Sequence, residues 1–142
     1  MEINWLGLVL ATLVPMVMGF IYYHPKLFGT AWMDSIGMTE EKQKSANMGK
    51  IMGISVVMSF LIAFFMTGFC NGLGQEGEFD SFGHGAAHGA IITVFFVFPI
   101  FVSNGLFEQK SVKNMLINGL YWMITLALMG GIVDYFHHWP NA

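Results

Sequence analysis

Charged side chains and cysteine are scarce in this chain, and arginine is absent. Charged residues make up 11% of the 142 residues, whereas a soluble domain carries about 25%. Apolar residues make up 55%, and they gather in uncharged runs as long as Ile3–Tyr23. Runs of that length exclude an ordinary soluble α domain and indicate a protein that spans a membrane. A net charge of −3 without any arginine also excludes a basic surface for nucleic acid.

The single cysteine, Cys70, excludes a disulfide within the chain, and its apolar neighbours predict an inert packing residue. Met1 and Glu2 alone precede the first apolar run, so we expect no cleaved signal peptide, which would begin with positive charge. Nucleotide-binding loops, nucleophile elbows and Cys-x-x-Cys pairs are missing from the sequence. The common enzyme classes that depend on these motifs are therefore excluded.

Four apolar segments are long enough, as helices, to cross the hydrocarbon core of a bilayer, which is about 30 Å thick. They lie at about residues 3–23, 51–71, 84–106 and 114–133. The predicted fold class is an all-α membrane protein, a four-helix transmembrane bundle, with residues 1–142 as a single integral membrane domain. The expected partners are the lipid bilayer and, beyond it, other membrane proteins or further copies of the chain.

Residues 22–33 are expected to mark the exit of the first helix from the membrane. They combine tyrosines, a tryptophan and a lysine, which are typical of the interface between hydrocarbon and headgroups. Pro25 disfavours helical geometry at His24, so the helix should end there. In the connection that follows, Thr39 is a plausible N-cap for a short helix over Glu40–Met48, which we expect to run directly into the second span.

The second span carries small residues at every fourth position. Such a row lets helix backbones approach closely, and it predicts the face on which this helix packs. The row consists of Ser55, Ser59, Ala63 and Thr67.

The lysines predict the orientation of the chain in the membrane. All six fall in the connections after the first and third spans, which share one side of a four-span protein; they are Lys26, Lys42, Lys44, Lys50, Lys110 and Lys113. By the positive-inside rule this side is cytoplasmic, and both termini face outward. The expected location is a bacterial cytoplasmic (inner) membrane.

A candidate polar site lies on the opposite, outer side. Asp80, His84 and His88 are four residues apart, so a continuous helix would place them on one face. If the third and fourth spans turn near residue 109, Asp134 lies level with His84, and Gly130-Gly131 lie level with His88 and leave a gap. Two histidines four residues apart can bind zinc, although the zinc-protease motif is absent because Gly85 stands in place of its glutamate.

The occupant of this site stays open at the level of sequence. The four residues Asp80, His84, His88 and Asp134 could bind a divalent metal ion, or they could bind a proton. A neighbouring carboxylate favours the charged imidazole, whereas burial favours the neutral ring. The alternative is that the histidines are only solvated at the interface and that the glycines only permit close packing.

Several short motifs resemble a known family. The chain is similar to the "domain of unknown function 1761" family at Gly19, Tyr22-Tyr23-His24-Pro25, Leu27-Phe28-Gly29, Trp32-Met33, Leu106-Phe107-Glu108, Asn118-Gly119-Leu120-Tyr121 and Met129-Gly130. The resemblance implies a small bacterial integral membrane protein with four helices, and it implies no activity, substrate or catalytic residue. The family pattern resembles Trp-Tyr-Ser-Pro where this chain has Tyr22-Tyr23-His24-Pro25, so His24 is a poor candidate for shared chemistry.

Two classes of function remain open. The first is a non-enzymatic membrane protein, either an accessory subunit or a small carrier, which the short extramembrane segments and the lack of catalytic motifs favour. The second is a metal-dependent membrane enzyme that uses His84, His88 and Asp134. Bound metal in the purified protein would distinguish the two, since a zinc enzyme should retain its ion.

Overall fold

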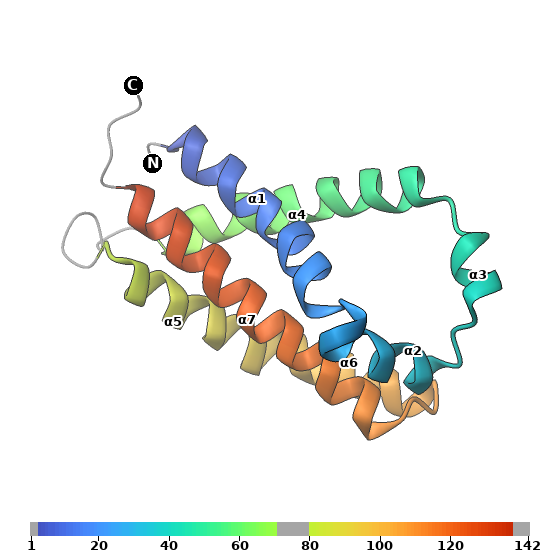
Figure 1. Cartoon of the computed structure of the whole chain (residues 1–142). Coiled ribbons are helices and arrows are strands. Elements are labelled where there is room, and N and C mark those ends of the chain that lie inside the picture. The colour runs from blue at the N-terminus through green and yellow to red at the C-terminus, as the bar shows by residue number, and fades with distance from the viewer. Residues whose placement is uncertain (1–2, 71–79, 138–142) are drawn as a thin grey trace.

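The computed structural model describes residues 3–70 and 80–137, and within these ranges the ordered elements are helices. Four helices are long and apolar enough to cross a membrane. They are α1 (Trp5–Tyr22), α4 (Met48–Cys70), a third formed by α5 (Phe82–Ile92), a π turn (Thr93–Val97) and α6 (Phe98–Phe107), and α7 (Val112–His137) (Figure 1). The prediction of an all-α membrane protein with four spanning helices is confirmed.

The two ends of the helices differ in composition. We call the end at which α1 and α6 finish and α4 and α7 begin the lysine end, because all six lysines lie on or near it. The other end, where α5 begins and α7 finishes, carries His84, His88 and His137, and we call it the histidine end.

At the lysine end, α1 stops where the sequence predicts. Its last residue is Tyr22, and His24 takes an extended conformation (φ −65°, ψ 140°) before Pro25. The chain then makes a wide turn over Pro25–Gly29, in which Leu27 departs from helical geometry. The helix α2 (Thr30–Ile36) follows, and sequence reasoning had assigned this segment to a polar connection.

The short helix α3 is confirmed at its start and corrected at its end. The Thr39 hydroxyl accepts a hydrogen bond from the Lys42 N–H, as expected of an N-cap. However, α3 covers only Glu40–Lys44 and does not continue into the second span. Asn47 explains the break, because its side-chain oxygen accepts from the Lys50 N–H and starts α4 as a separate helix.

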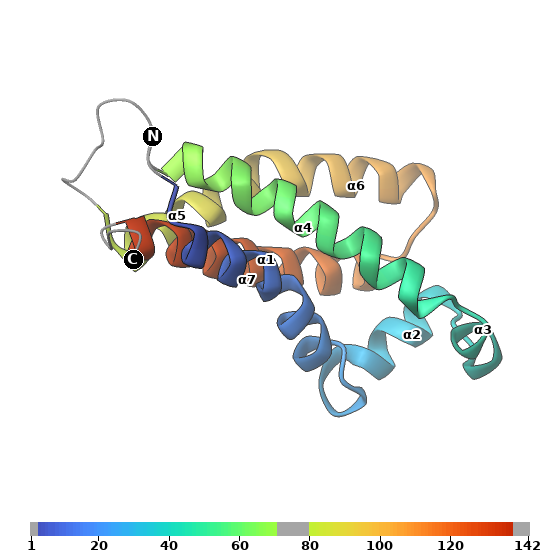
Figure 2. The same cartoon turned by 90° about the horizontal axis from the view of Figure 1, so that it is seen from above.

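The helix α7 is the centre of the packing, because it contacts α1, α4, α5 and α6 (Figure 2). Its buried residues Leu126, Met129 and Val133 form a core with side chains of α1 and α4. Three members of the predicted row on α4, Ser59, Ala63 and Thr67, are buried, and Ser55 is half-buried. Large apolar side chains elsewhere point outward, such as Phe20 with 72% of its surface exposed. An outward apolar surface of this kind suits contact with lipid.

The contact between α5 and α7 is made by glycines. A Cβ on Gly85 would lie 2.0 Å from the Gly130 carbonyl oxygen, and one on Gly89 would lie 2.0 Å from that of Leu126. A Cβ on Gly131 would meet the Phe82 ring at 2.6 Å. The expectation of a gap at Gly130-Gly131 is therefore wrong, and the glycines permit close packing of two backbones.

Candidate functional site

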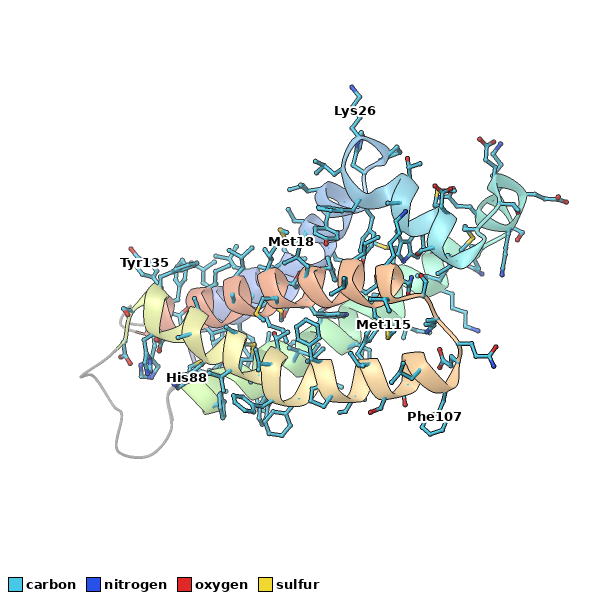
Figure 3. The ribbon with its side chains drawn as sticks, turned by 90° about the horizontal axis from the view of Figure 1, so that it is seen from below. Met18, Lys26, His88, Phe107, Met115 and Tyr135 are labelled. Carbon is cyan, nitrogen blue, oxygen red and sulfur yellow. The ribbon has the colours of Figure 1, made fainter. Side chains whose placement is uncertain are left out.

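The candidate site is built on the antiparallel pair α5 and α7 at the histidine end. The first turns of α5 lie beside the last turns of α7, and Figure 3 shows His88 and Tyr135 at this end, away from Phe107. The Ser81 hydroxyl caps α5 by accepting from the His84 N–H at 3.1 Å. The cap fixes the first turn of the helix and with it the position of His84.

Asp134 and His84 form a direct pair. Nδ1 of His84 lies 2.8 Å from Oδ2 of Asp134, whose side chain has no exposed surface. The same Oδ2 accepts a second hydrogen bond, at 3.2 Å, from the Ser81 N–H. Oδ1 of Asp134 is buried and has no hydrogen-bond partner among the described residues. An ionised Asp134 requires Nδ1 of His84 to carry a proton.

His88 completes this cluster one helical turn further along α5. The centres of the His84 and His88 rings are 4.3 Å apart, and the Phe69 ring of α4 covers His88 at 5.2 Å. Nδ1 of His88 is buried and has no hydrogen-bond partner within the described ranges. The depth matching of His84 with Asp134 is thus met by the geometry, and His88 is held beside the pair.

Asp80 belongs to a second pair. It lies before the start of α5, so the expected stacking of Asp80, His84 and His88 on one continuous helix does not occur. Nδ1 of His137, the last residue of α7, lies 2.8 Å from Oδ2 of Asp80, and the Asp80 side chain is only 3% exposed. The two pairs are reciprocal. The start of α5 supplies the histidine of the first pair and the carboxylate of the second, and the end of α7 supplies the carboxylate of the first pair and the histidine of the second.

His137 is a site residue that sequence reasoning missed. The apolar segment that predicts the fourth span ends at about residue 133, whereas α7 continues to His137. Its neighbour His138 lies outside the described residues. The signal that could have found His137 is its spacing of three residues from Asp134, which puts both on one helical face.

The donor set does not form a ready metal site. In residues 3–70 and 80–137, no group of three or more His, Cys, Asp or Glu side chains is arranged to hold one ion. Nδ1 of His84 is engaged by Asp134, so only Nε2 of this ring could serve as a ligand. Structural and catalytic zinc sites use at least three protein ligands.

An apolar layer separates this site from polar residues nearer the lysine end. On α7, Leu126, Met129 and Val133 are buried between Asp134 and Thr125. Nine residues of helix correspond to about 13 Å at about 1.5 Å per residue. Along α7, therefore, only apolar buried side chains separate Asp134 from Thr125.

The comparison with protein families gives the identity at family level. The model of a family described as a protein of unknown function (DUF1761) matches residues 6–133. The chain belongs to this family. No curated protein and no solved structure matches the chain. Membership of the DUF1761 family confirms the resemblance and carries no activity, so the function must be argued from the geometry of the site.

Proposed function

We propose that this DUF1761 protein is a small non-enzymatic membrane carrier for protons, and that His84 and Asp134 form its proton-binding site. The observation that carries the proposal is the 2.8 Å hydrogen bond between His84 and a fully buried Asp134 carboxylate. Ionisable groups inside membrane spans are energetically costly and mark ion or proton pathways. Histidine side chains serve as proton shuttles in proteins and need no cofactor for this role.

The surroundings of the pair support proton exchange. The His88 ring lies beside the His84 ring, tilted by 52°, and the buried Nδ1 of His88 has no hydrogen-bond partner in the described part of the chain. The buried Oδ1 of Asp134 also has no hydrogen-bond partner among the described residues. A proton that leaves His84 therefore has two nearby acceptors, and either could pass it on.

The apolar layer around Met129 favours a carrier over a channel. Met129 has no exposed surface, and Leu126 and Val133 are nearly as buried. On α7 no buried polar side chain lies between Asp134 and Thr125 to pass a proton on, so transport along this helix requires the helices to rearrange. We place the site on the outer face of a bacterial cytoplasmic membrane, with both termini outside, because the lysines lie at the other end of the helices.

The experiment is proton flux into liposomes that contain the purified protein and an internal pH dye. We expect wild-type protein to admit protons when the outside is acidified, and Asp134→Asn and His84→Gln to reduce the rate to that of empty liposomes. His24→Gln, at the lysine end, is the control and should keep the wild-type rate. A rate that Asp134→Asn leaves unchanged would contradict the proposal. No flux from wild-type protein would leave the accessory subunit as the non-enzymatic alternative.

A metal-dependent enzyme that uses His84, His88 and Asp134 is the alternative from the other class. Calorimetry with zinc distinguishes it from the carrier. The proposed proton site predicts no tight zinc binding, whereas the enzyme predicts one ion per chain, lost in His88→Ala and kept in His24→Ala. The second result would replace the proton with a divalent cation as the occupant of the site.

A further inference from the structure

A large cavity lies at the lysine end, far from the histidine cluster. Its volume is about 960 Å³, at the upper end of the range of about 300–1,000 Å³ for small-ligand sites. It is bounded by the end of α1, the wide turn after it, α2, the first turns of α4 and α7, and part of α6. Its lining includes Tyr23, His24, Trp32, Lys110 and Asn118.

A second, smaller cavity lies next to the first. Its volume is about 430 Å³, and its lining is apolar, with Leu61 and Phe65 of α4 facing Ile92 and Val97 of the third span. Trp122 of α7 lines both cavities and so forms a wall that they share. Together they offer a polar chamber near one membrane surface and an apolar extension toward the middle of the bilayer.

Several side chains that line the larger cavity have hydrogen-bond donors. The Tyr23 hydroxyl donates to Oδ1 of Asn118 at 2.6 Å, and the Asn118 amide donates to Oδ1 of Asn114 at 3.3 Å. These two hydrogen bonds use the side-chain oxygens of Asn118 and Asn114 as acceptors. The second N–H of each side-chain amide stays available to a ligand. The His24 Nδ1 accepts from the Lys26 N–H at 3.2 Å, so the neutral ring keeps its proton on Nε2.

The charge of this end is also positive. Six lysines lie on or near it, against the four acidic residues Asp34, Glu40, Glu41 and Glu108. Lys110 lines the larger cavity and forms an ion pair with Glu108, and both side chains are partly exposed. A ligand for this chamber should therefore carry hydrogen-bond acceptors and negative charge.

We propose that the two cavities form one binding site for an anionic phospholipid of the leaflet at the lysine end. The phosphate group lies near Lys110, His24 and Asn118, and one acyl chain passes Trp122 into the apolar cavity. A helix from a second copy of the chain fits less well, because its apolar surface would cover N–H groups of the chamber without offering them acceptors. A zwitterionic lipid lacks the net charge that the lysines attract.

The experiment is native mass spectrometry of the full-length protein in detergent, offered equal amounts of phosphatidylglycerol and phosphatidylcholine. We expect one phosphatidylglycerol per chain to be retained in preference. Lys110→Gln should lower this preference by about fivefold, the effect of one lysine near an anionic lipid. Lys113→Gln is the matched control, because it removes the same charge from a lysine that does not line the cavity, and it should keep the preference.

The acyl-chain part of the site has its own pair of variants. Leu61→Trp fills the apolar cavity and should reduce retention of phosphatidylglycerol severalfold, whereas Val57→Trp, one turn earlier on α4 and outside the lining, should not. Equal retention of the two lipids, or equal effects of Lys110→Gln and Lys113→Gln, would overturn the proposal. So would a dimer that retains no lipid, or retention of an added fatty acid in place of the phospholipid. Proton flux through the histidine end is a separate measurement, so the two proposals can fail independently.

Discussion

Asp134 brings a carboxylate into the contact between α5 and α7, where a histidine ring and one backbone N–H are its hydrogen-bond partners. Taking a charge out of water costs several kcal/mol, and the cost is recovered only when good partners are in place. The reciprocal pair of Asp80 and His137 repeats this solution at the same helix ends. Both pairs tie the start of α5 to the end of α7, and they expose the site to disruption by single substitutions.

A double-mutant cycle measures how strongly His84 and Asp134 depend on each other. We expect His84→Ala to destabilise the protein by about 3 kcal/mol, because it leaves a buried carboxylate without its partner. When His84→Ala is combined with Asp134→Leu, the interaction energy between the two substitutions should be about 1–3 kcal/mol. The free energy of unfolding in mixed micelles is the measurement. The exposed pair Glu40–Lys44 is the control, and its coupling should be close to zero; similar values for both pairs would contradict the buried interaction.

Tyr23 gives the lysine end a dependence on alkaline pH. Burial raises the pKa of Tyr23 above its ordinary value of 10.0, and neighbouring Tyr121 and Tyr22 raise it further. Because the raised pKa belongs to the folded state, the associated stability is complete below about pH 10 and is lost as the pH rises through the folded-state pKa. The midpoint temperature of thermal unfolding should therefore fall more steeply between about pH 8 and pH 11 for the wild type than for Tyr23→Phe. Tyr135→Phe, at the other end, should behave like the wild type, and identical slopes for Tyr23→Phe and the wild type would count against this assignment.

At the scale of elements, α5 and α7 are held together by backbone contact at glycines. Gly85→Ala would place a methyl group 2.0 Å from the Gly130 carbonyl oxygen, so the two helices must move apart. We expect a loss of about 1–3 kcal/mol in the free energy of unfolding, as for other overpacked sites. Gly83→Ala is the control on the same helix, because its methyl group would meet nothing within 4 Å. It should be neutral or stabilise the helix by up to about 1 kcal/mol, and equal effects at both positions would contradict the close contact.

The pairing of His84 with Asp134 could be predicted because it depends on local rules. A short turn between two antiparallel helices fixes which residues lie at equal depth, and the turn after α6 is short. The pairing of Asp80 with His137 could not be found this way, because Asp80 lies outside the helix and its position depends on where α5 begins. The row Ser55, Ser59, Ala63 and Thr67 was predicted from spacing alone, because small residues at every fourth position let helices pack closely. Its last three members are buried, whereas Ser55 is half-buried and lines the cavity at the lysine end.

The cavity at the lysine end was not predictable from the sequence. It depends on the turn after Pro25, where Leu27 leaves helical geometry and lets α2 approach α7. It also depends on a break before Met48 that separates α3 from α4. At both places the chain has local conformations that are nearly equivalent. The observed conformations are accompanied by contacts between distant segments, such as the one between Asn114 and Ser35. Periodicity and spacing carry no information about such contacts.

At the scale of the whole molecule, the chain separates two kinds of chemistry along the membrane normal. The lysine end has the positive charge, the aromatic rings and the larger cavity, and the histidine end has the two buried His–Asp pairs. Buried apolar side chains of α7, such as Met129, lie between them. Both proposals depend on this arrangement, since an outward-facing proton site and an anionic lipid of the opposite leaflet require the two ends to face opposite sides.

The orientation of the two ends is the central claim, and labelling of single cysteines in intact cells tests it most directly. Ser81 caps α5 beside Asp134, and Ser45 is exposed between α3 and α4 at the lysine end. In a Cys70→Ser background, Ser81→Cys should react with a membrane-impermeant thiol reagent added outside, and Ser45→Cys should react only after the cells are opened. The reverse pattern would place the His–Asp pairs inside and contradict the account.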